Sequence, residues 1–172
     1  MTSQQSDVNK PEGSPIHLSV GWREWVSLPE LGLPAIKAKV DTGARTSAIH
    51  ASDIERFKHD DGSDWVNFTV MPIQRLTTIS RRCAAPLVDI RKVTDSGGHT
   101  EERFFISTKL VIGELTRTVE ITLAQRSDML FRMLLGRTSM VPDIVVNPHL
   151  SYTLGRMKAR AIYKKSASGA DT

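Results

Sequence analysis

The chain has 172 residues, of which 40% are hydrophobic and 24% charged, a composition typical of a globular domain with its own core. Its formal net charge of +4 permits an acidic partner without requiring one. Cys83 is the single cysteine, which excludes an intrachain disulfide and a cysteine-rich zinc site. No apolar run approaches the roughly 20 residues of a membrane helix, and the N-terminus lacks the apolar segment of a signal peptide. We therefore expect a cytoplasmic protein without a membrane partner.

Composition divides the chain into three parts. Residues 1–15 are polar and contain glycine and proline, so they are expected to be a disordered leader. Residues 16–156 are expected to form one domain. Residues 157–172 are basic and end in small residues, which predicts a flexible tail that is either solvated or bound to an acidic partner. Aromatic residues make up only 6% of the chain, so a base-stacking platform is not expected, which argues against nucleic acid as a partner.

The first half of the domain shows short apolar segments separated by turn residues. Strands are expected at Trp22–Val26, Ile36–Val40 and Thr46–Ala51, and another strand contains Trp65, Phe68 and Val70. Residues 52–57 are interpreted as one helical turn capped by Ser52 or Asp53. Residues 60–63, with the sequence Asp-Asp-Gly-Ser, predict a turn.

The second half predicts two hairpins. Strands at Pro86–Val93 and Glu101–Ile106 flank a glycine-rich tip, and a second pair of strands flanks Gly113 and Glu114. A short helical or irregular piece is expected at Thr138–Met140. Many short strands with little helix favour an all-β barrel or sandwich.

The strand at residues 36–40 ends on Asp41, followed by Thr42 and Gly43. A carboxylate at the end of an apolar strand is costly unless it is hydrogen-bonded or has a function. The Thr42 hydroxyl can bond the backbone, and Gly43 allows a sharp turn in which amide groups approach the carboxylate. Because Asp, Thr and Gly are also common turn residues, the triplet alone is equally compatible with a plain β-turn.

A second segment gives this triplet its context. Val40-Asp41-Thr42-Gly43-Ala44, followed later by Leu134-Leu135-Gly136-Arg137, resembles the aspartic proteases of the retropepsin type. In that family the second segment crosses beneath the aspartate loop, and its glycine permits the close approach. Residues 20–51 and 132–140 resemble, more narrowly, a bacterial family known as ATP-dependent zinc proteases and also described as retropepsin-like. This resemblance covers about Val20 to Arg156.

The resemblance implies an all-β fold, a single retropepsin-like β-barrel lobe with a short helix and a flap-like hairpin. It implies that Asp41 is catalytic and that the residues supporting its loop are Thr42, Gly43, Ala44, Leu135 and Gly136. The hairpin tip at Ser96, Gly97 and Gly98 lies where a substrate-covering flap is expected, because Gly97 precedes Gly136 by 39 positions. An ordinary hairpin turn explains the same glycines. The interval from Asp41 to Gly97 is longer than in retropepsins, which predicts an insertion around Phe57–Ala85.

Aspartic proteolysis needs two carboxylates, one ionised to activate water and one protonated to polarise the scissile carbonyl. Asp95-Ser96-Gly97 has the same Asp-Ser/Thr-Gly form, but no apolar strand precedes it. The chain also contains a single Leu-Leu-Gly-Arg segment, which indicates one lobe. We therefore expect a homodimer in which each copy supplies its own Asp41.

Arg45 departs from the retroviral pattern, in which this position is acidic and pairs with the arginine that corresponds to Arg137. Two arginines cannot form that ion pair. We interpret Arg45, together with Arg137, as a substrate-binding residue that recognises carboxylates. The alternative is that Arg45 pairs with Asp53 or Glu55. Acidic substrates fit the resemblance, because these proteases are discussed beside an ATP-grasp ligase that adds glutamates to a ribosomal protein, which makes a glutamylated or ribosome-associated protein a candidate substrate.

No metal or nucleotide motif accompanies these residues. The five histidines lack the spacing of zinc proteases, although His50 and Asp53 could share one face, and no glycine-rich phosphate-binding motif is present. We expect neither a metal nor another cofactor. The favoured function is a dimeric aspartic endopeptidase acting on a peptide or protein. A non-catalytic peptide- or protein-binding module of the same fold remains the alternative, and a metallopeptidase ranks below both.

Overall fold

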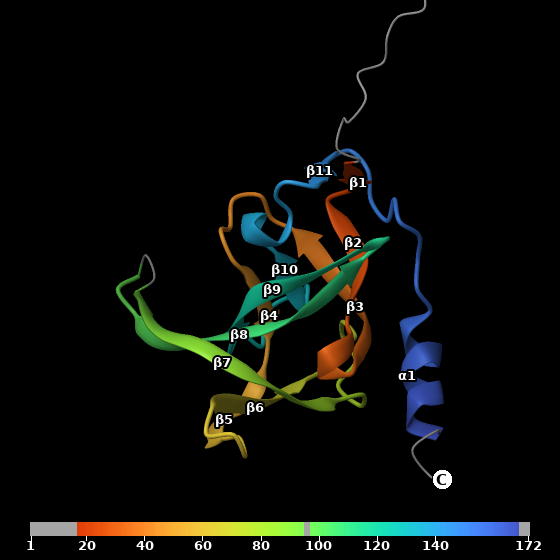
Figure 1. Cartoon of the computed structure of the whole chain (residues 1–172). Coiled ribbons are helices and arrows are strands. Elements are labelled where there is room, and N and C mark those ends of the chain that lie inside the picture. Colours follow the sequence, from red (N-terminus) through yellow and green to blue (C-terminus); the bar gives the residue numbers. More distant parts are fainter. Residues whose placement is uncertain (1–16, 95–96, 169–172) are drawn as a thin grey trace, which may run out of the picture.

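Eleven strands and one α-helix make up the part of the chain that the computed structural model describes, residues 17–94 and 97–168 (Figure 1). The strands are β1 (Leu18–Val20), β2 (Arg23–Leu28), β3 (Leu33–Val40), β4 (Ser47–His50), β5 (Ser52–Lys58), β6 (Asp64–Val70), β7 (Arg81–Thr94), β8 (Thr100–Ile112), β9 (Leu115–Ala124), β10 (Met133–Leu135) and β11 (Ile144–Val146). The helices are the 3₁₀ helices η1 (Pro29–Leu31) and η2 (Arg137–Ser139) and the α-helix α1 (Ala159–Ser168).

Six strands close into a barrel in the order β2-β3-β10-β4-β9-β8. The pairs β3–β10 and β4–β9 are parallel, and the other neighbours are antiparallel. The pairing of Ser27 with Val111 joins β2 to β8 and completes the ring. This mixed barrel confirms the predicted all-β barrel architecture.

The barrel interior is filled by the alternate residues of each strand. In β2, for example, Val26 and Leu28 are buried, whereas Trp25 and Ser27 are partly exposed on the other face. Burying one such aliphatic side chain contributes about 1.5–3 kcal/mol. Fully buried large aliphatic side chains of the core include Leu28, Leu33, Ile36, Ile49, Ile106, Leu110, Ile112, Ile121, Met133 and Leu135.

Strands β5, β6 and β7 extend the sheet beyond the barrel as an antiparallel addition to β8. This addition contains the predicted insertion at residues 57–85. The helical turn expected at residues 52–57 is wrong, because the segment is strand β5 and pairs with β6. Cross-strand contact outweighs the local capping signal: Phe57 lies opposite Trp65, with 6.4 Å between ring centroids. The turn after β5 is confirmed, and Gly62 occupies its left-handed position at φ 84°.

Both predicted hairpins are present. Strands β7 and β8 pair as far as Thr94 opposite Thr100, and β8 and β9 are joined through Gly113 and Glu114. Ser96, at the predicted flap tip, lies outside the described residues, as does the leader at residues 1–15.

The C-terminal segment differs from the predicted flexible tail, because residues 159–168 form helix α1 packed on β3. Ala159 and Tyr163 are one turn apart and both are buried, so the helix has an apolar face despite its basic composition. The Tyr163 hydroxyl donates a hydrogen bond to the Ala35 carbonyl at 2.7 Å. Burial raises the pKa of Tyr163 to about 12. No helix in residues 17–94 or 97–168 is long and apolar enough to cross a membrane.

A buried carboxylate ties the segment before α1 to the barrel. Glu24 on β2 is fully buried, and its Oε1 accepts hydrogen bonds from the backbone N–H of Gly21 at 2.8 Å and of Thr153 at 2.9 Å. The Thr153 hydroxyl donates to the same oxygen at 2.6 Å. These hydrogen bonds offset the cost of burying the Glu24 carboxylate. They also hold residues 150–154 against β2.

We predict that Tyr163→Phe lowers the free energy of unfolding by about 1 kcal/mol, because it removes the hydrogen bond to Ala35 and keeps the ring. Tyr163→Ala should lower the free energy of unfolding by about 3–5 kcal/mol, because it leaves a cavity between α1 and β3. Urea unfolding measures both. Lys164→Ala, on the exposed side of the same helix, is the control and should change stability by less than about 0.5 kcal/mol. Equal stability of all four proteins would mean that α1 does not dock on β3.

Candidate active site

Three strands, β3, β4 and β10, meet near Asp41. Strand β10 lies between β3 and β4, with Leu135 beside Val40 and Leu134 opposite Ala48. The loop from β3 to β4 therefore has to cross the end of β10. The Asp41 N–H donates to the Leu135 carbonyl at 2.9 Å, at the point where the two strands end. The structure thus brings together the Asp-Thr-Gly loop and the Leu-Leu-Gly-Arg segment, although about 90 residues separate them in sequence.

The Asp41 carboxylate is fixed by its own loop. Oδ1 accepts hydrogen bonds from the backbone N–H of Gly43 at 3.0 Å and of Ala44 at 3.2 Å. Backbone donors cannot rotate away as side chains do, so they orient the carboxylate firmly. No described residue donates to Oδ2, and the side chain is partly exposed. The second oxygen is therefore accessible to water, substrate or another carboxylate.

The two glycines of the motifs are needed for close approach. A Cβ on Gly136 would lie 2.6 Å from the Thr46 carbonyl carbon and 2.8 Å from the Ser47 nitrogen, which is closer than real contacts. A Cβ on Gly43 would lie 3.2 Å from Asp41 Oδ1. Neither glycine has a positive φ. Gly43 therefore serves by leaving room beside the carboxylate rather than by a left-handed turn.

Two serines that the sequence analysis missed support the crossing. Ser47 and Ser139 are fully buried, and their hydroxyl oxygens are 2.7 Å apart. The Gly136 N–H donates to Ser47 Oγ at 3.0 Å. The signal was weak, since a serine at the start of β4 and one in η2 are individually ordinary. Only the fold places them together under the loop.

The Arg137 side chain is hydrogen-bonded to the backbone of the Asp41 loop. Its Nη1 donates to the carbonyl oxygens of Thr42 at 2.9 Å and Gly43 at 3.0 Å. Its backbone N–H donates to the Ala44 carbonyl at 2.8 Å. The Thr42 side chain is exposed. Its hydroxyl makes no hydrogen bond to the backbone of the described residues, so Arg137 rather than this hydroxyl supports the loop. Arg137 therefore holds the loop, and its predicted contact with substrate stays a prediction.

Arg45 follows the loop and lines a groove of about 470 Å³ together with Thr46, Thr138, Arg91 and Glu120. Arg91 is paired there with Asp89 at 2.7 Å and with Glu120 at 3.4 Å, and Asp89 raises the pKa of Arg91.

The alternative pairing of Arg45 with Asp53 or Glu55 is wrong. Glu55 pairs with Arg82 at 2.8 Å, and the Asp53 carboxylate accepts from Ser52 at 3.3 Å. No acid among residues 17–94 and 97–168 pairs with the exposed Arg45.

The predicted hairpin tip and two titratable groups with shifted pKa values, His50 and Cys83, belong to elements other than the Asp41 loop. Gly97 and Gly98 are exposed at the end of the β7–β8 hairpin, which projects from the barrel in Figure 1. Their role as a flap stays a prediction. Burial lowers the pKa of His50, at the far end of β4, and raises that of Cys83 to about 12. Among the described residues, no group of three or more His, Cys, Asp or Glu is arranged to hold a metal.

The family follows from a comparison with known proteins. Residues 19–157 match the family model described as RimB-like, the retropepsin-like aspartic endopeptidase RimB. The chain belongs to the RimB-like family. This membership confirms the retropepsin-like resemblance and leaves the narrower zinc-protease resemblance a prediction.

Relatives with similar sequences include longer proteins. The chain is 44% identical over 147 residues to a probable α-L-glutamate ligase of Desulfotalea psychrophila, covering 84% of this chain and 31% of that protein. It is 45% identical over 139 residues to a probable α-L-glutamate ligase of Parasynechococcus marenigrum, covering 81% and 30% respectively. The chain thus spans about a third of the length of these relatives.

A solved structure supports the fold. A protein of unknown function from Legionella pneumophila aligns with a TM-score of 0.67 at 26% sequence identity, over 79% of this chain and 97% of that one.

We predict that Gly136→Ala lowers the free energy of unfolding by about 1–3 kcal/mol, because the new methyl group collides with backbone atoms of Thr46 and Ser47. Gly43→Ala is the graded comparison. Its methyl group meets only the Asp41 side chain at 3.2 Å, so it should cost less stability. Denaturant unfolding of both variants gives the ranking, and a Gly136→Ala protein as stable as wild type would contradict the close crossing.

Proposed function

We propose that this protein is an aspartic endopeptidase whose active form is a homodimer with one Asp41 from each copy. The observation that carries the proposal is the Asp41 carboxylate, held by two backbone N–H groups over the Gly136 crossing in a chain of the RimB-like family. A peptide or protein is the substrate class that this family implies.

The geometry suits a pair of carboxylates that share one proton. The ionised Asp41 takes a proton from a water molecule as the water oxygen attacks the scissile carbonyl carbon. The protonated Asp41 of the second copy gives its proton to the carbonyl oxygen, which yields a tetrahedral diol. As the diol collapses and the C–N bond breaks, the Asp41 that took the water proton gives it to the leaving nitrogen. The now ionised Asp41 of the second copy takes a proton from a diol hydroxyl, which releases the carboxylic acid and the amine and restores the shared proton. Because Oδ1 is occupied by loop N–H groups, Oδ2 is the oxygen available for these transfers.

An exposed apolar segment supports the dimer. Val141, Val145 and Leu150 are large hydrophobic side chains with 60%, 50% and 42% of their surface exposed. They follow the Gly136 crossing within 14 residues, so a contact between copies through this segment acts directly on the loop support. An isologous contact places the same patch of both copies on one axis, as a shared site requires.

We further propose that Arg45 selects acidic side chains of the substrate. It is exposed, follows the Asp41 loop and has no acidic partner among the described residues, while its neighbour Arg91 is already paired. A guanidinium group binds a carboxylate in a two-pronged manner. The relatives named as probable α-L-glutamate ligases support a glutamate-rich or glutamylated protein as the substrate. We propose a ribosome-associated protein as one such candidate.

We predict that Asp41→Asn lowers kcat/KM for cleavage of a peptide library by about 10²–10⁴-fold, because asparagine cannot exchange the proton. Activity of the wild type should be unchanged by EDTA. Asp61→Asn, in the exposed turn after β5, is the matched control and should be fully active. Equal mixing and refolding of wild type with Asp41→Asn should lower the activity per wild-type chain to about half, because random pairing makes half of the wild-type chains partners of an inactive copy.

Retained activity in Asp41→Asn would reject Asp41 as the catalytic group. Specific binding of peptides without any cleavage would instead favour the binding module of the same fold.

We predict that Arg45→Gln lowers the preference for a glutamate-containing peptide over its glutamine analogue by about tenfold or more, because a charge-assisted hydrogen bond is lost. The ratio of the two kcat/KM values is the measurement. Arg56→Gln, on the exposed part of β5, is the control. An unchanged ratio in Arg45→Gln would show that Arg45 does not bind the acidic side chain of the substrate.

A further inference from the structure

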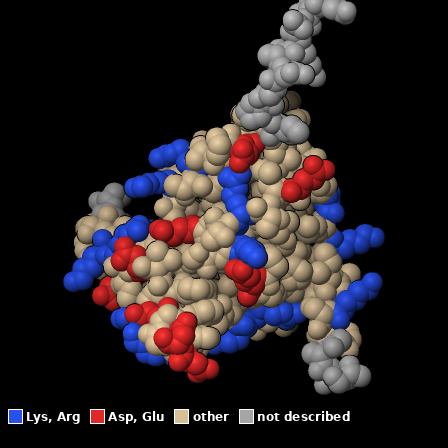
Figure 2. All heavy atoms as spheres, in the orientation of Figure 1, with Lys and Arg blue, Asp and Glu red and all other residues tan. Residues whose placement is uncertain are grey.

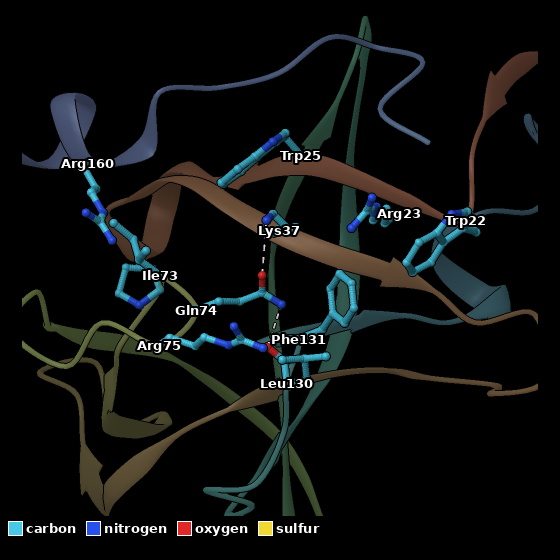
Figure 3. Close-up of a pocket in the computed structure, with 11 residues that line it drawn as sticks. Trp22, Arg23, Trp25, Lys37, Ile73, Gln74, Arg75, Leu130, Phe131 and Arg160 are labelled. Carbon is cyan, nitrogen blue, oxygen red and sulfur yellow. Dashed lines mark hydrogen bonds between the residues drawn. The ribbon is translucent and has the colours of Figure 1, made fainter. Parts of the chain in front are cut away.

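A second concave site lies on the outer face of β2 and β3. It is a cavity of about 490 Å³ whose walls come from these two strands, from the loop at residues 72–75, from Leu130 and Phe131 and from Arg160 of α1 (Figure 3). We call it the cationic groove. None of its residues lines the groove beside Arg45.

The cationic groove is lined by four basic side chains and no acidic one. These are Arg23, Lys37, Arg75 and Arg160. None of the four pairs with an acid in residues 17–94 or 97–168. The buried Nε of Arg23 also lacks a hydrogen-bond partner among those residues. Like charges gathered without a counter-charge are unfavourable, so this surface is suited to an anionic ligand.

Aromatic rings and an amide hold two of these cations, Arg23 and Lys37, in place. The Arg23 guanidinium lies 4.4 Å from the Trp22 ring centroid and 4.7 Å from that of Tyr152. Lys37 Nζ lies 5.3 Å from the Trp25 centroid and donates to Gln74 Oε1 at 3.1 Å (Figure 3). The rings therefore act as supports for the protein's own cations. That use favours a chain of carboxylates over stacked nucleic-acid bases as the ligand.

The cationic groove is also close to Asp41 along β3. Lys37 precedes Asp41 by four residues of extended chain, which corresponds to about 13 Å. The Trp22 carbonyl accepts the N–H of Val40, the residue before Asp41. About four to six extended residues of a polypeptide thus span the interval from the Asp41 loop to this groove.

The basic surface continues from the groove onto α1. This helix contains Arg160, Lys164 and Lys165 and no acidic residue. Figure 2 shows blue side chains without red ones along the visible edge of α1. An extended acidic segment leaving the groove therefore meets further positive charge.

We propose that the cationic groove binds an acidic stretch of the polypeptide that is cleaved at Asp41. The link to cleavage rests on the proposed function, whereas binding itself does not require Asp41. An acidic segment held about four to six residues from the scissile bond raises the local concentration of that bond at the Asp41 loop.

The test measures binding in the Asp41→Asn variant of the 172-residue chain, so that cleavage does not interfere. Fluorescence anisotropy of labelled hexaglutamate and hexaglutamine peptides, and of a labelled single-stranded RNA, is recorded at 0.15 M salt. We expect hexaglutamate to bind. In a Lys37→Gln/Arg75→Gln variant, the Kd for hexaglutamate should rise by about tenfold or more.

The matched control is Arg56→Gln/Lys58→Gln. It removes the same two charges from exposed positions on β5 and should leave the Kd nearly unchanged, because distant charges are screened at this salt concentration. Equal weakening in both double variants, absence of hexaglutamate binding, or tighter binding of RNA through the same groove residues would each overturn the proposal.

A second measurement separates this proposal from the proposed function. In a chain with intact Asp41, the Lys37→Gln/Arg75→Gln variant should raise KM for a substrate with an acidic extension, and leave the cleavage of a short neutral peptide unchanged. If the wild type binds hexaglutamate through the groove and cleaves nothing, the endopeptidase fails and the acidic-peptide site stands. If the wild type cleaves and KM for the extended substrate is unchanged in the variant, the groove proposal fails alone.

Discussion

The close crossing of Gly136 under the loop from β3 to β4 is the constraint on which the site depends. Strand β10 can lie between β3 and β4 only if the chain leaving it passes within contact distance of Thr46 and Ser47. The absence of a side chain at Gly136 allows this approach, and the hydroxyl of Ser47 satisfies the Gly136 N–H that the crossing buries. The same crossing brings the Leu135 carbonyl to the N–H of Asp41. Barrel closure and carboxylate orientation are therefore consequences of one packing arrangement.

The crossing also determines how the charges beside Asp41 are used. Arg137 follows Gly136 directly, so its guanidinium reaches the carbonyl oxygens of Thr42 and Gly43 within the same chain. An acid at position 45 is not needed to satisfy it. Arg45 is exposed and has no acidic partner among the described residues, whereas the retroviral pattern has an acid at this position.

Much of the fold and the centre of the site could be predicted from the sequence, because the signals are local. Alternating apolar residues and glycine-rich tips identify the hairpins β7–β8 and β8–β9, and a strand that ends on Asp41 identifies the loop. The helical turn predicted at residues 52–57 is wrong because the capping signal is local in sequence. The pairing of Phe57 with Trp65, which favours a strand, involves a residue outside that segment. The docking of α1 buries Ala159 and Tyr163, whose spacing is hard to recognise within a basic segment.

What could not be predicted are the arrangements that only the tertiary structure creates. Ser47 and Ser139 are 92 positions apart and meet in a buried contact. The sequence around Arg160 does not indicate which strands it meets, yet Arg160 lines a groove with Trp22 and Trp25, because α1 docks on β3. Periodicity identifies the faces of strands, but it does not show which faces a distant helix will join. Sites assembled from several segments therefore have to be found in the fold.

Under the proposed function, one barrel orients the Asp41 carboxylate and a second copy supplies the other carboxylate. The loop orients Oδ1 of Asp41 and leaves Oδ2 open, and a lone group of this kind cannot act as acid and base at the same time. The exposed apolar residues Val141 and Val145 lie on the chain just beyond the crossing, so a second copy bound there would press on the segment that supports the loop. Association and catalytic geometry would then be coupled: an isolated chain keeps an incomplete site, and activity rises with protein concentration as the copies pair.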